Sequence, residues 1–118
     1  LLPLSSPAIS WGWLAVWEPR GKWPNELVAS LCQELRLVHC VDPFAAKPAT
    51  KGVYYFRLHG KTGYRYQYSD ADLEWLAAAI PPARNVYCMF NNVTMAEDAQ
   101  RFVGIVGRAG TARRRQAL

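Results

Sequence analysis

The sequence contains little of what marks membrane proteins, zinc-binding modules or nucleotide-binding domains. No apolar stretch reaches the ~18–20 residues that a membrane-spanning helix needs. The three cysteines, Cys32, Cys40 and Cys88, show no CxxC spacing, and no GxGxxG, Walker A or HExxH motif is present. Cysteines that lie singly inside apolar runs are typical of a reducing compartment. We therefore expect a cytoplasmic protein without a membrane partner.

The excess of positive charge is confined to the last eleven residues. The formal net charge is +5, and four arginines, Arg108, Arg113, Arg114 and Arg115, account for most of it. A short arginine run binds nucleic acid by neutralising phosphates, but chain ends of this kind are more often solvated and disordered. We assign residues 108–118 to a basic, disordered tail. The nearly neutral body disfavours a nucleic-acid partner.

The body has the composition of a folded protein, with 51% hydrophobic, 13% aromatic and 19% charged residues. Apolar runs that are typical of buried parallel strands alternate with segments of helical spacing. The expected strands are 13–17, 37–41, 53–58 and 86–90, and the expected helices are 24–35, 69–80 and 94–106. The last helix has an apolar stripe of Ala99, Phe102, Val103 and Val106.

This order, β-α-β-β-α-β-α, predicts an α/β fold with a parallel sheet. The chain has 118 residues, about half of the ~250 that a complete (β/α)₈ barrel uses. We therefore predict a partial (β/α)₈ TIM-type barrel over residues 1–107, formed by its second half with four strands and three helices. A small doubly wound sheet is the main alternative, although no glycine-rich phosphate loop follows any strand.

Two features of this fold need explanation. About ten residues separate Asp42 from Val53, which is short for a helical crossover, and Pro43 and Pro48 disfavour a helix there. Either a brief turn replaces the helix or the two strands do not form a normal β/α unit. A half-barrel also has two unpaired edge strands, so we expect a homodimer or the missing N-terminal half-barrel to complete it. The start at Leu1, without an initiator methionine, agrees with a fragment or a trimmed chain.

Every predicted strand becomes polar at its carboxyl end. In a parallel barrel these ends meet at one rim, where the loops form the site. In chain order the residues are Glu18 and Arg20, Asp42, Arg57 and His59, and Asn91 and Asn92.

Each of these residues also has a purely structural interpretation. Glu18 and Arg20 could pair with each other, Asp42 could form a turn before Pro43, and Asn91 and Asn92 could cap the next helix. A single histidine before a glycine is more often a hydrogen-bonded loop residue than a catalytic base. The alternating Tyr64, Tyr66 and Tyr68 could form an aromatic wall over a pocket, or a loop that packs on the rim.

These residues belong to segments that resemble the YecE-like family, a domain of unknown function with a β/α barrel. The resemblance covers about Leu14 to Val106 and matches the family's second half. The segments that carry it are Trp17–Trp23 (WEPRGKW), Val41–Phe44 (VDPF), Tyr55–Gly60 (YFRLHG), Gly63–Ser69 (GYRYQYS) and Tyr87–Asn92 (YCMFNN). The resemblance implies that the family's N-terminal strands, with their own rim residues, are absent from this chain.

The polar rim favours a pocket for an anionic or polyhydroxylated small molecule, including one that bears phosphate. Glu18, Asp42 and His59 are the candidate catalytic residues, with His59 as the proton donor or acceptor. The candidate substrate-binding residues are Arg20, Trp23, Arg57, Tyr64, Tyr66, Asn91 and Asn92.

The sequence does not decide whether such a pocket belongs to an enzyme. A metal-dependent hydrolase would use Glu18, Asp42 and His59 as ligands, but no HxH or HExxH spacing supports it, so we assign no metal. No cofactor is identified. The alternatives are a nucleic-acid-associated protein that uses the arginine tail and exposed aromatics, and an inactive structural fragment.

Overall fold

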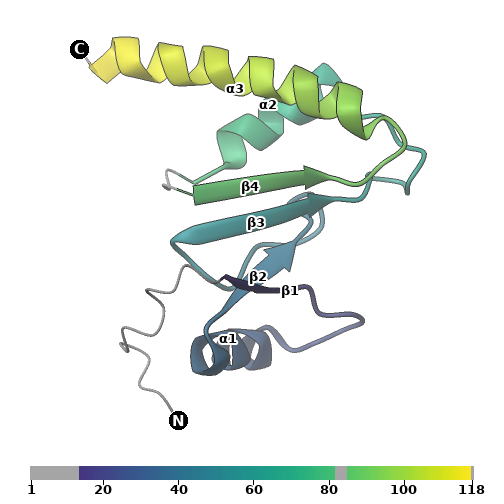
Figure 1. The fold of residues 1–118 in the computed structure, drawn as a ribbon, viewed down its shortest axis with the longest axis vertical. Helices are drawn as coiled ribbons and strands as arrows, with labels where there is room; N and C mark the ends of the chain where they lie inside the picture. Colours follow the sequence, from purple (N-terminus) through teal and green to yellow (C-terminus); the bar gives the residue numbers. More distant parts are fainter. Residues whose placement is uncertain (1–13, 82–84, 118) are drawn as a thin grey trace. The chain divides into compact units, whose positions relative to one another are not determined.

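The computed structural model describes residues 14–81 and 85–117, and it confirms the predicted order of elements (Figure 1). The strands belong to one four-stranded sheet in the order β1-β2-β3-β4, in which β1 pairs with β2, and β2 with β3, in parallel. In chain order the elements are β1 (Ala15–Trp17), α1 (Asn25–Leu35), β2 (Leu37–Val41), β3 (Val53–Leu58), α2 (Asp70–Ala79), β4 (Asn85–Phe90) and α3 (Met95–Ala117). The fold is therefore α/β, with the strands and helices that part of a (β/α)₈ barrel supplies.

The irregular joint between β2 and β3 is a brief turn that replaces the crossover helix. Asp42 O accepts hydrogen bonds from Ala45 N (2.9 Å) and Ala46 N (3.0 Å), which closes the chain on itself directly after β2. The next strand still pairs in parallel, with Cys40 opposite Tyr55. Of the two alternatives that the sequence left open, the structure therefore has the brief turn in place of the helix.

The ends of α1 and α2 follow from local side chains and backbone geometry. Ser69 accepts a hydrogen bond from Asp72 N, and the Asp72 carboxylate accepts one from Ser69 N, so the two residues form a capping box. Helix α1 ends at Leu35, and the next residue, Arg36, caps it with a left-handed backbone (φ 56°) and an N–H that donates to Cys32 O. That turn leads directly into β2.

The described residues form two compact units. The first lies within Leu1–Phe56 and Ala83–Tyr87, and the second within Arg57–Pro82 and Cys88–Leu118. In the first unit the buried apolar side chains are Val28, Cys32, Cys40, Val41 and Phe56. In the second unit α2 packs against α3, and the buried apolar side chains are Leu58, Tyr68, Leu73, Leu76, Ala77, Phe102 and Ile105.

Helix α3 differs from its prediction in the face that it buries. Asp98, Phe102 and Ile105 are buried, whereas Val103, which we predicted to lie in the apolar stripe, is 71% exposed. Asp98 accounts for the shift, because its carboxylate accepts hydrogen bonds from buried groups of the second unit. The helix is assigned through Ala117, although the sequence predicts a disordered tail from residue 108. Among the described residues, no helix is both long and apolar enough to cross a membrane.

Candidate functional site

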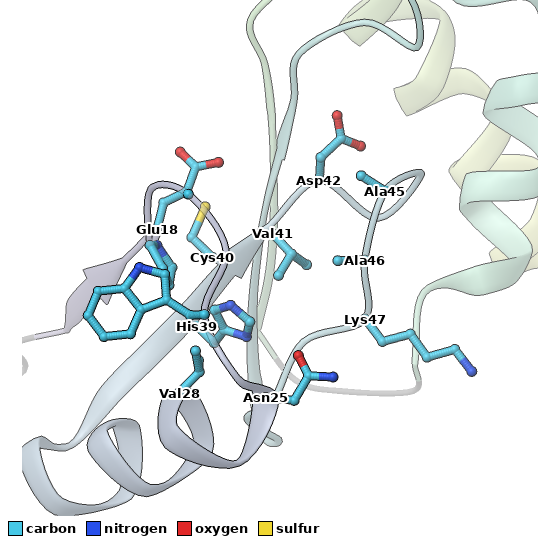
Figure 2. A pocket seen from close by; sticks show the side chains of 13 residues that line it. Glu18, Asn25, Val28, His39, Cys40, Val41, Asp42, Ala45, Ala46 and Lys47 are labelled. Carbon is cyan, nitrogen blue, oxygen red and sulfur yellow. The ribbon is translucent and has the colours of Figure 1, made fainter.

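The first compact unit contains a pocket at the carboxyl ends of β1 and β2. Its volume is about 290 Å³, and Glu18, Trp23 and Asp42, three of the predicted site residues, line it (Figure 2). Glu18 directly follows β1 and Asp42 directly follows β2, so the parallel pairing of the two strands carries both residues to the same end. Asn25 and Val28, from the first turn of α1, add a polar and an apolar side chain to the wall.

Trp23 is held in place as part of the pocket wall. Its Nε1–H donates a hydrogen bond of 2.8 Å to Arg20 O, and its ring meets Trp17 edge to face with centroids 5.2 Å apart. The side chain of Arg20 is exposed and does not line the pocket. The contribution of Arg20 that the structure shows is therefore its carbonyl group, which orients the indole.

Asp42 forms a turn as well as lining the pocket. Its Oδ1 accepts a hydrogen bond of 3.0 Å from Phe44 N, which is the arrangement of an Asx turn. The structural interpretation of Asp42 from the sequence is thus correct, and it is compatible with a place in the pocket wall.

His39 also lines the pocket, and the sequence analysis did not select it. It lies within β2 rather than after it. Its Nδ1 accepts a hydrogen bond of 2.9 Å from Ala49 N, and its backbone N–H donates to Thr50 Oγ1 at 3.0 Å. Burial lowers the pKa of His39. A single imidazole within an otherwise apolar strand was the signal that could have found it.

The second compact unit brings together His59 and Asn91, two other predicted site residues. Asn91 Nδ2 lies 3.5 Å from His59 Nδ1, and Asn91 N donates to Leu58 O at 2.9 Å, which sets the two strand ends side by side. Arg57, two residues before His59, is half-buried. Gly60 follows with φ 93°, and a Cβ there would come within 2.0 Å of Gly63 O, so only glycine fits at the position after His59.

Asn92 and Tyr66, which the sequence predicts to bind substrate, form hydrogen bonds within the second unit. Asn92 has no exposed surface, and its Nδ2 donates to Tyr66 O and to Asp98 Oδ2, both at 2.8 Å. The hydroxyl of Tyr66 donates to Asp72 Oδ2. Of the predicted aromatic wall, Tyr64 remains mostly exposed.

Tyr66 and Lys61 together hold the carboxylate of Asp72. Lys61 Nζ lies 3.1 Å from Asp72 Oδ1, opposite the contact with Tyr66. Desolvation raises the pKa of Asp72, but hydrogen bonds from Tyr66, Ser69 and Lys61 outweigh it and lower the pKa to about 2. The same contacts raise the pKa values of Lys61 and Tyr66, since both keep their protons while they donate to Asp72. This cluster fixes the loop before α2.

Within the part of the chain that the structure describes, no three or more His, Cys, Asp or Glu side chains are grouped so that they could hold a metal ion. Glu18 and Asp42 line the pocket of the first unit, while His59 belongs to the second.

Comparison with known proteins identifies the family of the chain. A search of curated proteins and a search of solved structures each found no significant match. A family model described as "Protein of unknown function DUF72" matches residues 19–117, which is most of the chain. The match agrees with the segments that resemble the YecE-like family and with the parallel α/β architecture. The chain therefore belongs to the DUF72, or YecE-like, family of β/α-barrel proteins.

Proposed function

We propose that this chain binds a small polar molecule, rich in hydroxyl groups or bearing an anionic group, in the pocket at the carboxyl ends of β1 and β2. The observation that supports this function is the pocket itself, which unites Glu18, Trp23 and Asp42 around a volume of about 290 Å³. Ligand sites usually have volumes of ~300–1,000 Å³, so the pocket suits a ligand near the lower end of that range.

The side chains in the wall supply the contacts that such a ligand requires. Carboxylates accept hydrogen bonds from hydroxyl groups, and hydrogen bonds to charged groups are stronger than neutral ones. The indole of Trp23 offers an apolar face whose orientation is set by Arg20 O. Asn25 both donates and accepts hydrogen bonds, and it lines the same pocket. An aromatic surface with a few convergent polar groups is the usual construction of a small-molecule site.

In the second unit, Arg57, His59 and Asn91 are groups of a kind that bind anions and transfer protons. A guanidinium forms charge-assisted hydrogen bonds with an anion, and a histidine is the usual side chain for proton transfer near neutral pH. Ligand binding measured with Arg57→Ala and His59→Ala tests these residues separately from the pocket of the first unit.

The proposal is tested by calorimetric titration with free sugars, sugar alcohols and sugar phosphates. Glu18→Gln should weaken binding by about tenfold or more, since the variant keeps the shape of the side chain and loses a charged acceptor. Glu34→Gln is the matched control, because Glu34 is an exposed residue of α1 that does not line the pocket. Equal affinities of the two variants for a ligand that the wild-type chain binds would contradict the proposal.

A further inference from the structure

We propose that His39 is a pH-sensitive switch, which holds one wall of the pocket in place at neutral pH and releases it when the imidazole gains a proton. That wall belongs to the pocket loop, residues 42–50, which follows β2. The inference rests on the proposed function of the pocket and adds a means of regulating it.

The pocket loop supplies several of the residues that a ligand would meet. Ala45, Ala46 and Lys47 line the pocket, together with Asp42 at the start of the loop. The start is fixed by its own turn, in which Asp42 O accepts hydrogen bonds from Ala45 N and Ala46 N. The shape of this wall therefore depends on how the rest of the loop is held.

His39 holds the far end of the pocket loop by two hydrogen bonds. Ala49 N–H donates to Nδ1 of the imidazole at 2.9 Å, and Thr50 Oγ1 accepts from the backbone N–H of His39 at 3.0 Å. The first bond requires a lone pair on the ring nitrogen, so it exists only while Nδ1 has no proton. The second bond involves the backbone of His39 and does not depend on the charge of the ring.

Protonation of His39 breaks the first of these bonds and keeps the second. Both ring nitrogens of an imidazolium carry protons, so Nδ1–H would face Ala49 N–H, one donor against another. The ring and the amide must move apart, and residues 45–49, between the turn at Asp42 and the contact at Thr50, lose a bond that positions them. A wall that is no longer fixed has to be ordered again when a ligand binds, which weakens binding.

The switch operates on the acid side of neutrality. Burial lowers the pKa of His39 from its ordinary value of 6.5, so the ring is neutral at pH 7 and can accept from Ala49 N. Because folding lowers this pKa, the contribution of the neutral ring to stability is present above pH 6.5. It is lost as the pH falls through the folded-state pKa.

Other titratable and charged groups surround His39, and acid changes some of them as well. Those that line the pocket with it are Glu18 after β1, Asp42 after β2 and Lys47 in the pocket loop. The residues of α1 that line the pocket, Asn25 and Val28, are uncharged. Opposite His39 in β1 lies Trp17, and in β3 Tyr54 is nearest in register. A variant that lacks only the imidazole keeps all of these groups, so a comparison with it isolates His39.

Two variants of His39 fix the pocket loop in opposite states. The amide oxygen of asparagine reaches the position of Nδ1, so His39→Asn can accept from Ala49 N at every pH. Leucine has a similar volume and no acceptor, so His39→Leu leaves the loop released at every pH. Thermal unfolding at pH 7 shows whether each variant is folded. The comparison of the wild-type chain with His39→Asn stands without the leucine variant.

The switch itself is tested by NMR without any ligand. As the pH is lowered from 7, the ring protons of His39 report its protonation, and hydrogen exchange of Ala49 N–H, relative to an unfolded peptide at the same pH, reports its bond. We expect the protection of this amide to fall as the ring gains its proton, to the level found in His39→Leu. In His39→Asn it should stay constant. Protection that persists after His39 is charged, or a ring that stays neutral until the chain unfolds, would overturn the switch.

Calorimetric titration over the same pH range then tests the effect on the pocket, with free hexoses, sugar alcohols and hexose 6-phosphates as probes. The affinity of the wild-type chain, relative to that of His39→Asn at the same pH, should fall by roughly two- to tenfold as His39 gains its proton. This is the range for the loss of one neutral hydrogen bond. His39→Leu should bind more weakly than His39→Asn already at pH 7. The comparison at equal pH also cancels the titration of the phosphate group.

The outcomes distinguish the two proposals. If the wild-type chain and His39→Asn lose affinity in parallel, acid acts on other groups of the pocket and the switch is overturned. The proposed function then still stands, provided that Glu18→Gln weakens binding. If no probe binds the wild-type chain at any pH, both proposals are overturned.

Discussion

Replacing Asp98 by alanine tests whether a buried carboxylate holds the second unit together. Asp98 has no exposed surface. Its Oδ2 accepts hydrogen bonds from Tyr68 N at 3.1 Å, Asn92 Nδ2 at 2.8 Å and Thr94 Oγ1 at 2.9 Å, and its Oδ1 accepts one from Arg101 Nη1 at 3.1 Å. The carboxylate therefore joins α3 to the loop before α2 and to the loop after β4.

The expected loss in free energy of unfolding depends on the hydrogen bonds that each partner of Asp98 keeps in the variant. Arg101 retains hydrogen bonds to Tyr68 O and to Asp70, so its charge is still compensated. Tyr68 N and Asn92 Nδ2 each lose a buried acceptor, as well as the favourable charge of the carboxylate. A buried donor left without an acceptor costs ~1–3 kcal/mol, so for these two donors we expect Asp98→Ala to lower the free energy of unfolding by about 2–6 kcal/mol.

Asp70→Ala is the matched control, since Asp70 contacts the same arginine at 2.6 Å but its side chain is 79% exposed. An exposed ion pair contributes about 1 kcal/mol or less, even at the first turn of a helix. Urea unfolding of both variants, followed by circular dichroism, gives the two free energies of unfolding. If Asp98→Ala costs no more than Asp70→Ala, the carboxylate does not have the structural role that we assign to it.

Two other predictions concern pH and the arginine tail. Asp72 has a folded-state pKa of about 2 against an ordinary value of 3.8, so its contribution to stability is present above pH ~4 and disappears as the pH falls toward 2. In urea titrations, the difference in free energy of unfolding between the wild-type chain and Asp72→Asn should therefore shrink between pH ~4 and pH ~2. A constant difference would contradict this prediction. Deleting residues 108–118 lowers the net charge from +5 to +1. We expect the truncated chain to bind its ligand in the pocket as the full chain does, and to bind single-stranded DNA more weakly and with less dependence on salt. Loss of ligand affinity in the truncated chain would show that the pocket depends on the arginine tail and would contradict this prediction.

The arrangement of strands and helices was predictable because covered parallel strands and capped helices leave strong local patterns. The apolar run 53–58 corresponds residue for residue to β3, and Ser69 caps α2 as its sequence indicates. The buried face of α3 was not predictable in the same way. Apolar periodicity selects Val103, but the carboxylate of Asp98 turns a different face inward. Hydrogen bonds to distant backbone groups, such as Tyr68 N, leave no periodic signal.

The strand ends show a second limit, because neighbouring residues on an extended chain point in opposite directions. Asn91 is exposed and lies beside His59, whereas Asn92 has no exposed surface and binds Asp98. The Asn-Asn pair predicts that one residue faces the rim and the other the interior. It does not predict which, since that depends on where β4 ends and the loop begins.

The two anomalies of the sequence, a histidine inside an apolar strand and a joint too short for a helix, have one explanation. An imidazole that lies partly buried in a strand needs a hydrogen-bond partner, or it destabilises the fold. A crossover helix would bond its own N–H groups internally and leave few for His39. The irregular loop instead presents Ala49 N–H to Nδ1 and Thr50 Oγ1 to the backbone of His39. Loss of the helix thus supplies the two hydrogen bonds that hold His39 in the wall of the pocket.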